Sequence, residues 1–353
     1  MPHLPTPTPD SAPADAGSPD PAELTELDLA LVEALQLDPR TPWTRIGTAV
    51  GIDATTAARR WDRLESSGLA WLTAYRTLPT QTVGYLDVDC APGRLRELTA
   101  ELCRWPAVFS LERTTGRHQL FLGAAATDLR ALDTLVTHRL AELPGVTSLR
   151  LTVVTRVYRE GSGWLVRALA PEQRAALDGT AAQARLVTPA RWNDKELEAL
   201  LDALCADGRR SCADLARDCG MSESAVRRVL ARMLRNHELD FRCDLAHTLG
   251  GWPVIATYRL DVPGNRLDGV ARTLATQPET RFCAAVTGEH NLLLMTWLRT
   301  PADCTDFEAH LTGLAPSARV TDRTVTLFMP KRMGRLLDAD GRAVGQLTIT
   351  PAA

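Results

Sequence analysis

The chain has 353 residues, of which 45% are hydrophobic and 24% are charged, and its formal net charge is −3. This length allows two to four domains, and the composition is that of a globular protein. The small net charge excludes a protein that coats nucleic acid over its whole surface, although it allows a local basic face. No apolar run reaches the ~18 residues that span a bilayer, and no basic-then-apolar leader begins the chain, so we expect a cytoplasmic protein.

Residues 1–21 are rich in Pro, Ala, Ser and Asp and show no apolar periodicity, so we expect a disordered tail. The remaining chain repeats itself. Thr115-Gly116-Arg117-His118-Gln119 returns 172 residues later as Thr287-Gly288-Glu289-His290-Asn291, and the Val50-Gly51-Ile52 segment returns 169 residues later as Cys219-Gly220-Met221. Two landmarks with nearly the same offset indicate a duplicated two-part module. The offset is far longer than the ~20–50 residues of a solenoid repeat, so the chain is a tandem of domains and not a stacked array.

Each module begins with three short helices. In the first, Leu27, Leu31 and Leu35 follow helical spacing, Gly51 ends the second helix, and Asp53 caps the third. The second module repeats this pattern with Gly220 and with Ser222 as the cap. Two short helices, a tight glycine turn and a polar third helix are typical of a helix-turn-helix.

After each set of helices the sequence predicts a β-α-β-β-α-β order, which is the ferredoxin-like arrangement. The fold class is therefore α+β, a tandem duplication of two winged-type helix-turn-helix domains and two ferredoxin-like βαββαβ domains. The Asp340-Gly341 pair predicts a hairpin in the C-terminal extension. The expected divisions are a tail (1–21), helix-turn-helix domain 1 (22–78), sheet domain 1 (79–160), a linker (161–191) whose stretch after Pro171 can form a helix, helix-turn-helix domain 2 (192–248), sheet domain 2 (249–330) and a C-terminal extension (331–353).

The two third helices carry arginine and hydroxyl side chains that can contact phosphates and base edges in a major groove. A solvated surface face is the plain alternative, but the same pattern occurs twice before the same domain and favours double-stranded DNA as a partner. The candidate DNA-binding residues are Arg45, Thr55, Thr56, Arg59, Arg60, Arg63, Ser222, Ser224, Arg227, Arg228 and Arg232. Asp62 and Glu65 weaken the positive field of the first copy, so we expect the second to be the stronger reader.

The repeated glycine–histidine turns are the second candidate site. Glycine and amide residues are routine in turns, but a histidine in both copies favours a ligand pocket. The candidate effector-binding residues are Gly116, Arg117, His118, Gln119, Gly288, Glu289, His290 and Asn291. No nucleophile or carboxylate accompanies the histidines at a suggestive spacing, and the chain has no P-loop, GxGxxG or HExxH motif.

The eight cysteines include no CxxC pair, and Cys205, Cys212 and Cys219 recur at helix-face spacing. We interpret them as small packing residues in a reducing compartment. The sequence thus gives no positive indication of catalysis, so we expect no enzyme, no catalytic residue, no metal and no cofactor.

These motifs resemble the Lrp/AsnC (feast/famine) family of prokaryotic transcription regulators. The resemblance rests on Asp38-Pro39-Arg40, Val50-Gly51-Ile52 and Gly68-Leu69 in the first copy, and on Asp207-Gly208-Arg209 and Gly220-Met221-Ser222 in the second. It implies a helix-turn-helix joined to an effector-sensing domain, called RAM, and a small-molecule effector such as an amino acid or related metabolite bound between RAM domains. It also implies oligomers, here a homo-oligomer of two to four fused chains.

The chain departs from that family in two respects. Gln119 and Asn291 replace the acidic residue that follows the turn, and Arg117 against Glu289 makes the two turns chemically unequal. The siroheme decarboxylases, which are similar to the same family, provide an enzymatic alternative with arginine- and histidine-rich substrate contacts. The corresponding stretch, residues 242–250, contains a single histidine and no Arg-His-Arg cluster, which favours the regulator. A metabolite sensor without DNA readout is the remaining alternative.

Overall fold

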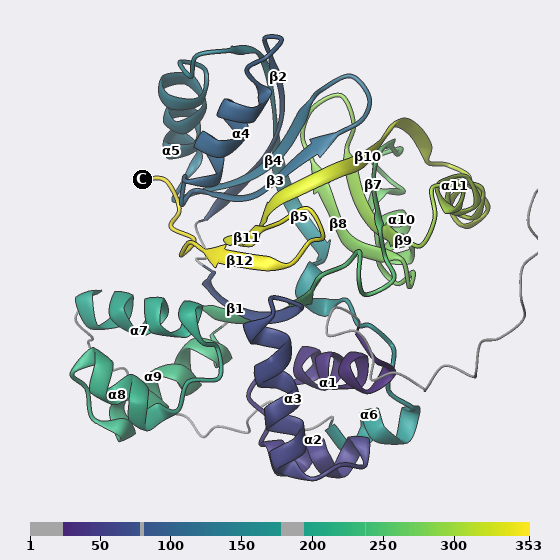
Figure 1. The fold of residues 1–353 in the computed structure, drawn as a ribbon. Helices are drawn as coiled ribbons and strands as arrows, with labels where there is room; N and C mark the ends of the chain where they lie inside the picture. The colour runs from purple at the N-terminus through teal and green to yellow at the C-terminus, as the bar shows by residue number, and fades with distance from the viewer. Residues whose placement is uncertain (1–23, 78–80, 178–193, 237) are drawn as a thin grey trace, which may run out of the picture.

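The computed structural model describes residues 24–77, 81–177, 194–236 and 238–353. Two helical heads lie at one end of the molecule, and two sheet domains with their helices lie at the other (Figure 1). A two-stranded sheet lies between the heads and the sheet domains. The tail expected over residues 1–21 falls outside the described residues.

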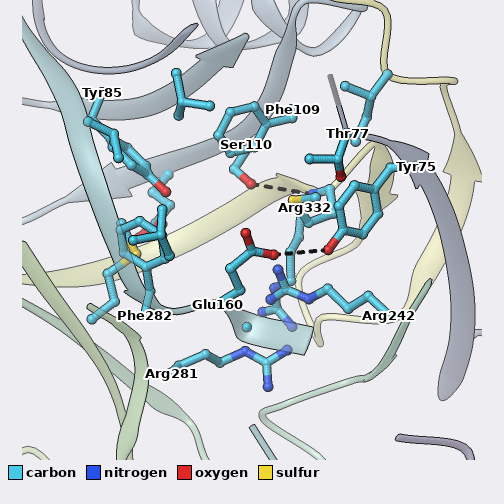
Figure 2. Close-up of a pocket in the computed structure, with 18 of the residues that line it drawn as sticks. Tyr75, Thr77, Tyr85, Phe109, Ser110, Glu160, Arg242, Arg281, Phe282 and Arg332 are labelled. Atoms are coloured by element: carbon cyan, nitrogen blue, oxygen red, sulfur yellow. Dashed lines mark hydrogen bonds between the residues drawn. The ribbon is translucent and has the colours of Figure 1, made fainter. Parts of the chain in front are cut away.

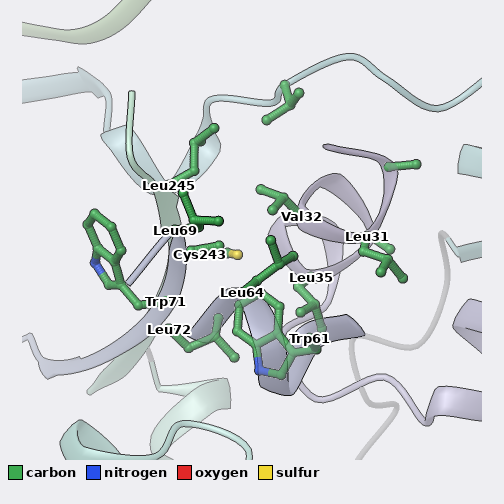
Figure 3. Packing of buried hydrophobic residues seen from close by; sticks show 14 of the residues in the cluster. Leu31, Val32, Leu35, Trp61, Leu64, Leu69, Trp71, Leu72, Cys243 and Leu245 are labelled. Atoms are coloured by element: carbon green, nitrogen blue, oxygen red, sulfur yellow. The ribbon is translucent and has the colours of Figure 1, made fainter. Parts of the chain in front are cut away.

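The first head contains α1 (Glu26–Leu37), α2 (Trp43–Val50) and α3 (Ala54–Ser66). Gly51 ends α2 in the left-handed conformation, and the Asp53 carboxylate accepts the backbone N–H of Thr56 at the start of α3. Leu31, Leu35, Ile46, Trp61 and Leu64 form its buried core (Figure 3).

The second head repeats this structure with α7 (Asp194–Ala206), α8 (Cys212–Cys219) and α9 (Glu223–Arg235). Gly220 is again left-handed, and the Ser222 hydroxyl caps α9 through the backbone N–H of Ala225. Both helix-turn-helix units expected from the repeat are therefore present.

The heads are joined to each other by a strand from each copy. β1 (Ala70–Arg76) pairs antiparallel with β6 (Leu239–Leu245), and Thr73 lies opposite Arg242. These two residues are 169 residues apart, which is the offset of the repeat in this region. A local pseudo-two-fold axis therefore passes between the two strands.

The first sheet domain contains β2 (Thr82–Cys90), α4 (Leu95–Cys103), β3 (Val108–Thr114), β4 (Leu120–Ala126), α5 (Leu129–Thr134), the π-helical turn η1 (Leu135–Leu140) and β5 (Val146–Arg159). The second contains β7 (Val254–Asp261), α10 (Leu267–Ala275), β8 (Thr280–Val286), β9 (Leu292–Leu298), α11 (Asp303–Leu314) and β10 (Arg319–Arg332). The predicted β-α-β-β-α-β order is confirmed in both copies.

The long last strands, β5 and β10, join the two domains. β5 pairs with β2 of its own copy and β8 of the other, and β10 pairs with β7 of its own copy and β3 of the other. The strands consequently close into a ring in the order β3-β4-β2-β5-β8-β9-β7-β10. The helices pack on the outside over separate apolar cores, and Tyr85, Phe121 and Leu293 form a further cluster between the sheets.

The connecting segment contributes η2 (Gly161–Gly163) and α6 (Pro171–Leu177), a helix where one was expected after Pro171. Leu177 is buried with the first head, and Arg174 pairs with the buried Glu33 of α1. The segment is therefore part of the first head's packing.

The C-terminal extension forms the hairpin of β11 (Arg335–Leu337) and β12 (Ala343–Gln346), as Asp340-Gly341 predicted. Ala343 donates its N–H to the Gly68 carbonyl of the first head, and the Thr348 hydroxyl donates to Asp202 of the second. Further on, Ala352 exchanges backbone hydrogen bonds beside β4. The extension thus contacts both heads and the first sheet domain.

Candidate functional site

The two glycine–histidine turns dock on the long strand of the opposite copy. Thr115 donates its N–H to the Val325 carbonyl at 2.8 Å, and its hydroxyl oxygen accepts the Val325 N–H at 2.9 Å. Thr287 makes the same two bonds with Val153, at 2.9 and 3.0 Å. Both partners are related by the 172-residue offset, so the turns join the two domains symmetrically.

The amide residues of the turns complete the ends of neighbouring strands. The Gln119 side chain accepts the N–H of Cys90, and Asn291 accepts from and donates to the backbone of Val262. Gly116 and Gly288 have φ of +92° and +113°, which favours glycine. These four candidates therefore already have roles in folding.

The charged members of the two turns are placed unequally. His118 contacts Asp89 at 3.0 Å, whereas His290 is buried, and burial together with nearby Arg259 lowers its pKa to about 4. Glu289 pairs with Arg150, whereas Arg117 is exposed. None of the eight turn candidates lines the cavity between the sheets.

That cavity has a volume of about 340 Å³ and lies where the sheets face β1 and β6. Its apolar wall comes from β2, β3 and β8. The Tyr85 ring makes edge-to-face contacts with Phe109 and Phe282, at ring-centroid distances of 6.1 and 5.5 Å. Figure 2 shows these rings on one side and the labelled arginines Arg242, Arg281 and Arg332 on the other. The cavity therefore has an aromatic side and a basic side.

Arg281 is a deeply buried cation of the basic side. Its side chain is 4% exposed, and its guanidinium carbon lies 3.8 Å from the centroid of the Trp297 ring and 4.9 Å from that of Trp164. One nitrogen, Nη2, donates to Asp244, but Nη1 and Nε lack a hydrogen-bond partner among the described residues. Buried donors without partners are costly, so the hydrogen bonding of this guanidinium is incomplete among the described residues.

The other two arginines share the same carboxylate. Arg242 Nε lies 2.8 Å and Arg332 Nη1 lies 3.9 Å from Asp244. Burial raises the pKa of Asp244, but the three arginines outweigh burial and hold the pKa below its ordinary value. Asp244 therefore stays ionised and fixes the arginines in place.

His247 lies behind this cluster and accepts a hydrogen bond from Arg332 at 2.9 Å. Burial, and then the charges of Arg332 and Arg281, hold its pKa well below the ordinary value, so the ring is neutral. Residues 242–250 contribute only Arg242 and His247, as their sequence shows, and the cluster is completed by Arg281 of β8 and Arg332 of β10. No local spacing could have revealed a cluster that long-range strand pairing assembles.

Two carboxylates also reach the cavity. Glu112 is 4% exposed, and burial raises its pKa, while its oxygen accepts the Thr326 hydroxyl. Glu160 accepts a bond from Tyr75, and burial followed by the charge of Asp240 raises its pKa. The polar lining therefore contains both donors and acceptors.

The first of the two helices predicted to contact DNA, α3, uses part of its basic face inside the head. Arg60 and Arg63 pair with the buried Asp28 at 3.1 and 2.7 Å, and Arg45 of α2 donates to the Ala176 carbonyl of α6. Hydrogen bonds from Thr25 and Arg63 outweigh the effect of burial and lower the pKa of Asp28. Thr56 bonds to the capping Asp53, while Thr55 and Arg59 are exposed.

The second of these helices, α9, is more open. Ser222, Ser224, Arg227 and Arg228 are all exposed on α9. Arg227 pairs with Glu223 one turn away, and Arg232 lies 3.6 Å from Glu238. Arg228 is an exposed cation without such a pairing among the described residues, so α9 offers the freer basic face.

Two negative findings apply to the described part of the chain. None of its helices combines the length and apolarity required to cross a membrane. Its histidine, cysteine and acidic side chains form no group of three or more that could hold a metal ion.

The domain comparisons match this geometry. The AsnC-type helix-turn-helix domain matches residues 24–65 and again 198–234, and the Lrp/AsnC ligand binding domain matches residues 84–164. The molecule is therefore a two-headed helix-turn-helix protein with ligand-binding-type sheet domains. It belongs to the Lrp/AsnC family, in a tandem form with two modules in one chain.

Single-module regulators are among its relatives. An uncharacterised HTH-type transcriptional regulator of Pyrococcus horikoshii is 27% identical over 143 residues, which is 39% of this chain and 90% of the relative. The regulator LrpA of the same organism is 29% identical over 129 residues, covering 35% of this chain and 91% of LrpA.

The solved structure of the siroheme decarboxylase NirDL is similar along almost the whole chain. It covers 88% of this chain and 93% of its own, with a TM-score of 0.56 and 14% sequence identity. At 14% identity the similarity shows the fold alone, which is a tandem of two modules in one chain.

Proposed function

We propose that the protein is a sequence-specific DNA-binding transcription regulator whose affinity for DNA responds to a small molecule bound between its two sheet domains. The observation that carries the proposal is the coupling of the two heads. Arg40 donates to the carbonyls of Gly208 and Arg210 at 2.6 and 2.8 Å, and Arg209 donates to those of Pro39 and Thr41 at 2.6 and 2.7 Å.

This reciprocal contact ties the two heads to each other, which supports a role in reading paired half-sites. Dimeric helix-turn-helix proteins read two half-sites separated by multiples of a helical turn. Because α3 and α9 differ in sequence and in free arginines, the operator is an imperfect palindrome, with the stronger half-site under α9. The proposal places the protein in the cytoplasm, where prokaryotic DNA lies, as a homo-oligomer of two to four chains.

The effector acts through linkage. It changes DNA affinity only to the extent that it binds one arrangement of the heads more tightly than another. The cavity supports this role, because its lining includes Tyr75 and Arg76 of β1, Arg242 of β6 and Met333 and Ile349 of the C-terminal extension. A ligand there contacts both strands that carry the heads and the extension that contacts them.

Operator selection from random DNA followed by a fluorescence titration tests the proposal. Arg228→Ala should weaken binding by about 1–3 kcal/mol for a base contact, whereas a lost phosphate contact lowers the salt slope by about one unit. Arg59→Ala tests the first head in the same way. Arg130→Ala, which removes an exposed arginine from α5, is the matched control. Failure to select any sequence, or unchanged binding of the Arg228 and Arg59 variants, contradicts the proposal.

A tetrapyrrole-binding enzyme is the second candidate. NirDL is a siroheme decarboxylase, and one of its structures is a co-complex with an iron-uroporphyrin III analogue. The arginines of the cavity favour this candidate, whereas Glu112 and Glu160 oppose a ligand that carries many carboxylates. An absorbing tetrapyrrole copurifying with the protein, without selectable DNA, would favour the enzyme.

A further inference from the structure

The cavity lies on the pseudo-two-fold axis but has lost the symmetry of that axis. Glu160 and Arg332 occupy equivalent positions 172 residues apart, and so do Phe109 and Arg281. All four line the cavity. A symmetric dimer would present each of these residues twice, in two equivalent half-sites. Here one half is basic where the other is acidic or aromatic, so a ligand has a single orientation and binds once per chain.

The basic half supplies the donors for one anionic group. Arg281 has unpaired Nη1 and Nε atoms, packs against the rings of Trp164 and Trp297, and is restrained by Asp244. Guanidinium donors match the planar geometry of a carboxylate, and a donor already held in place loses little entropy on binding. Arg242 lies beside it on the same carboxylate and carries its terminal nitrogens next to Gly161.

The opposite half selects the body of the ligand. Tyr85, Phe109 and Phe282 present rings, and Met295 and Val154 extend the apolar wall. Stacked and edge-on rings favour a flat aromatic body. The volume of about 340 Å³ is at the lower end of the ~300–1,000 Å³ that small-molecule sites occupy, which fits a ligand of one or two rings.

The two carboxylates limit the charge of the ligand. Glu112 and Glu160 lie in the same lining as the arginines, so a second ligand carboxylate would meet acidic side chains in the cavity. We propose that the cavity binds one aromatic monocarboxylic acid per chain, with its carboxylate on Arg281 and its ring against Tyr85, Phe109 and Phe282. This inference rests on the proposed function only in treating the cavity as the effector site.

Isothermal titration of the full-length protein with 1-naphthoate, and with uncharged 1-naphthamide as its matched analogue, tests the proposal. We expect one naphthoate per chain and at least tenfold weaker binding of the amide, because the amide removes the charge but keeps the rings. Arg281→Met should weaken naphthoate at least tenfold and leave the amide nearly unchanged. Val154→Phe, which fills the aromatic side and spares the arginines, should weaken both ligands.

Arg130→Ala should bind both ligands as the parent protein does, and thermal unfolding identifies any variant that fails to fold. If Arg281→Met does not fold, the ratio of naphthoate to naphthamide affinity in the parent protein and the effect of Val154→Phe still test the proposal. Equal binding of acid and amide, two sites per chain, or no naphthoate binding at millimolar concentration overturns the proposal. Tight binding of iron-uroporphyrin III that excludes naphthoate overturns it in favour of a tetrapyrrole.

A DNA titration of the same samples keeps the two proposals apart. Naphthoate binding without selectable DNA contradicts the regulator but leaves the ligand site intact. Specific DNA binding without naphthoate binding contradicts the ligand class but leaves the regulator intact.

Discussion

Asp87 and Arg259 occupy the same position in the two copies, 172 residues apart, and form a buried ion pair with each other. The Asp87 oxygen lies 2.5 Å from Arg259 Nη2, and both side chains are under 8% exposed. In a dimer of identical modules this position would face its own copy, and two like charges would meet. Fusion in one chain allowed the two positions to become complementary.

Breaking this pair should destabilise the protein. Asp87→Ala leaves Arg259 buried with only the half-exposed Asp322 as its carboxylate, so we expect a loss of about 3 kcal/mol in the free energy of unfolding. Adding Arg259→Met should restore much of that loss, because the uncompensated charge is removed. Urea denaturation measures both variants. Asp133→Asn, at an exposed position on α5, is the control, and an additive double variant would refute the coupling.

The approach of the C-terminal extension to the first head should make Gly68 irreplaceable. A Cβ at this residue would lie 2.3 Å from the Ala343 carbonyl oxygen, and the backbone φ is +68°. Gly51 has a similar φ of +80° but no atom within 4 Å of the same position. Gly51→Ala should therefore cost only the backbone strain of about 1–2 kcal/mol, and Gly68→Ala clearly more. Equal losses of stability for the two variants in thermal unfolding would show that the C-terminal extension moves away from residue 68 without measurable cost.

Regular elements were predictable from the sequence because the duplication shows each signal twice. Gly51 and Gly220 end the second helices, and Asp53 and Ser222 cap the third, by local chemistry alone. The site was not predictable to the same degree. Arg281 and Arg332 reach the cavity by strand pairing between copies, and Arg60 and Arg63 lose their freedom to Asp28, whose burial depends on tertiary packing.

The reciprocal arginine contact between the heads should fix operator spacing. Arg209→Ala removes two charge-assisted bonds and the stacking of its guanidinium 3.9 Å from the Trp43 ring centroid. Bonds of this kind contribute about 1.5–3 kcal/mol each when their partners are otherwise unsatisfied. With Arg40→Ala added, the heads should tolerate half-sites moved by one or two base pairs that the parent protein rejects. Titrations against operators with different half-site spacings measure this tolerance. An unchanged spacing preference would show that the pairing of β1 with β6, and not the arginine contact, fixes the relative position of the heads.

Stability should fall as the pH is lowered, in part through His290. Burial and then the charge of Arg259 hold its pKa at about 4 in the folded protein, below the ordinary value of 6.5. The unfolded chain therefore binds the proton first, and the stability that neutral His290 provides is present at pH 7 and is lost as the pH falls from about 6.5 to about 4. The shift corresponds to about 3 kcal/mol over that range. Urea denaturation of the parent and of His290→Asn at pH 7 and pH 4.5 isolates this contribution, because every other titrating group, including the buried His247, is present in both proteins. The variant should lose less stability than the parent, and identical losses would mean that His290 is protonated in the folded state as readily as in the unfolded chain.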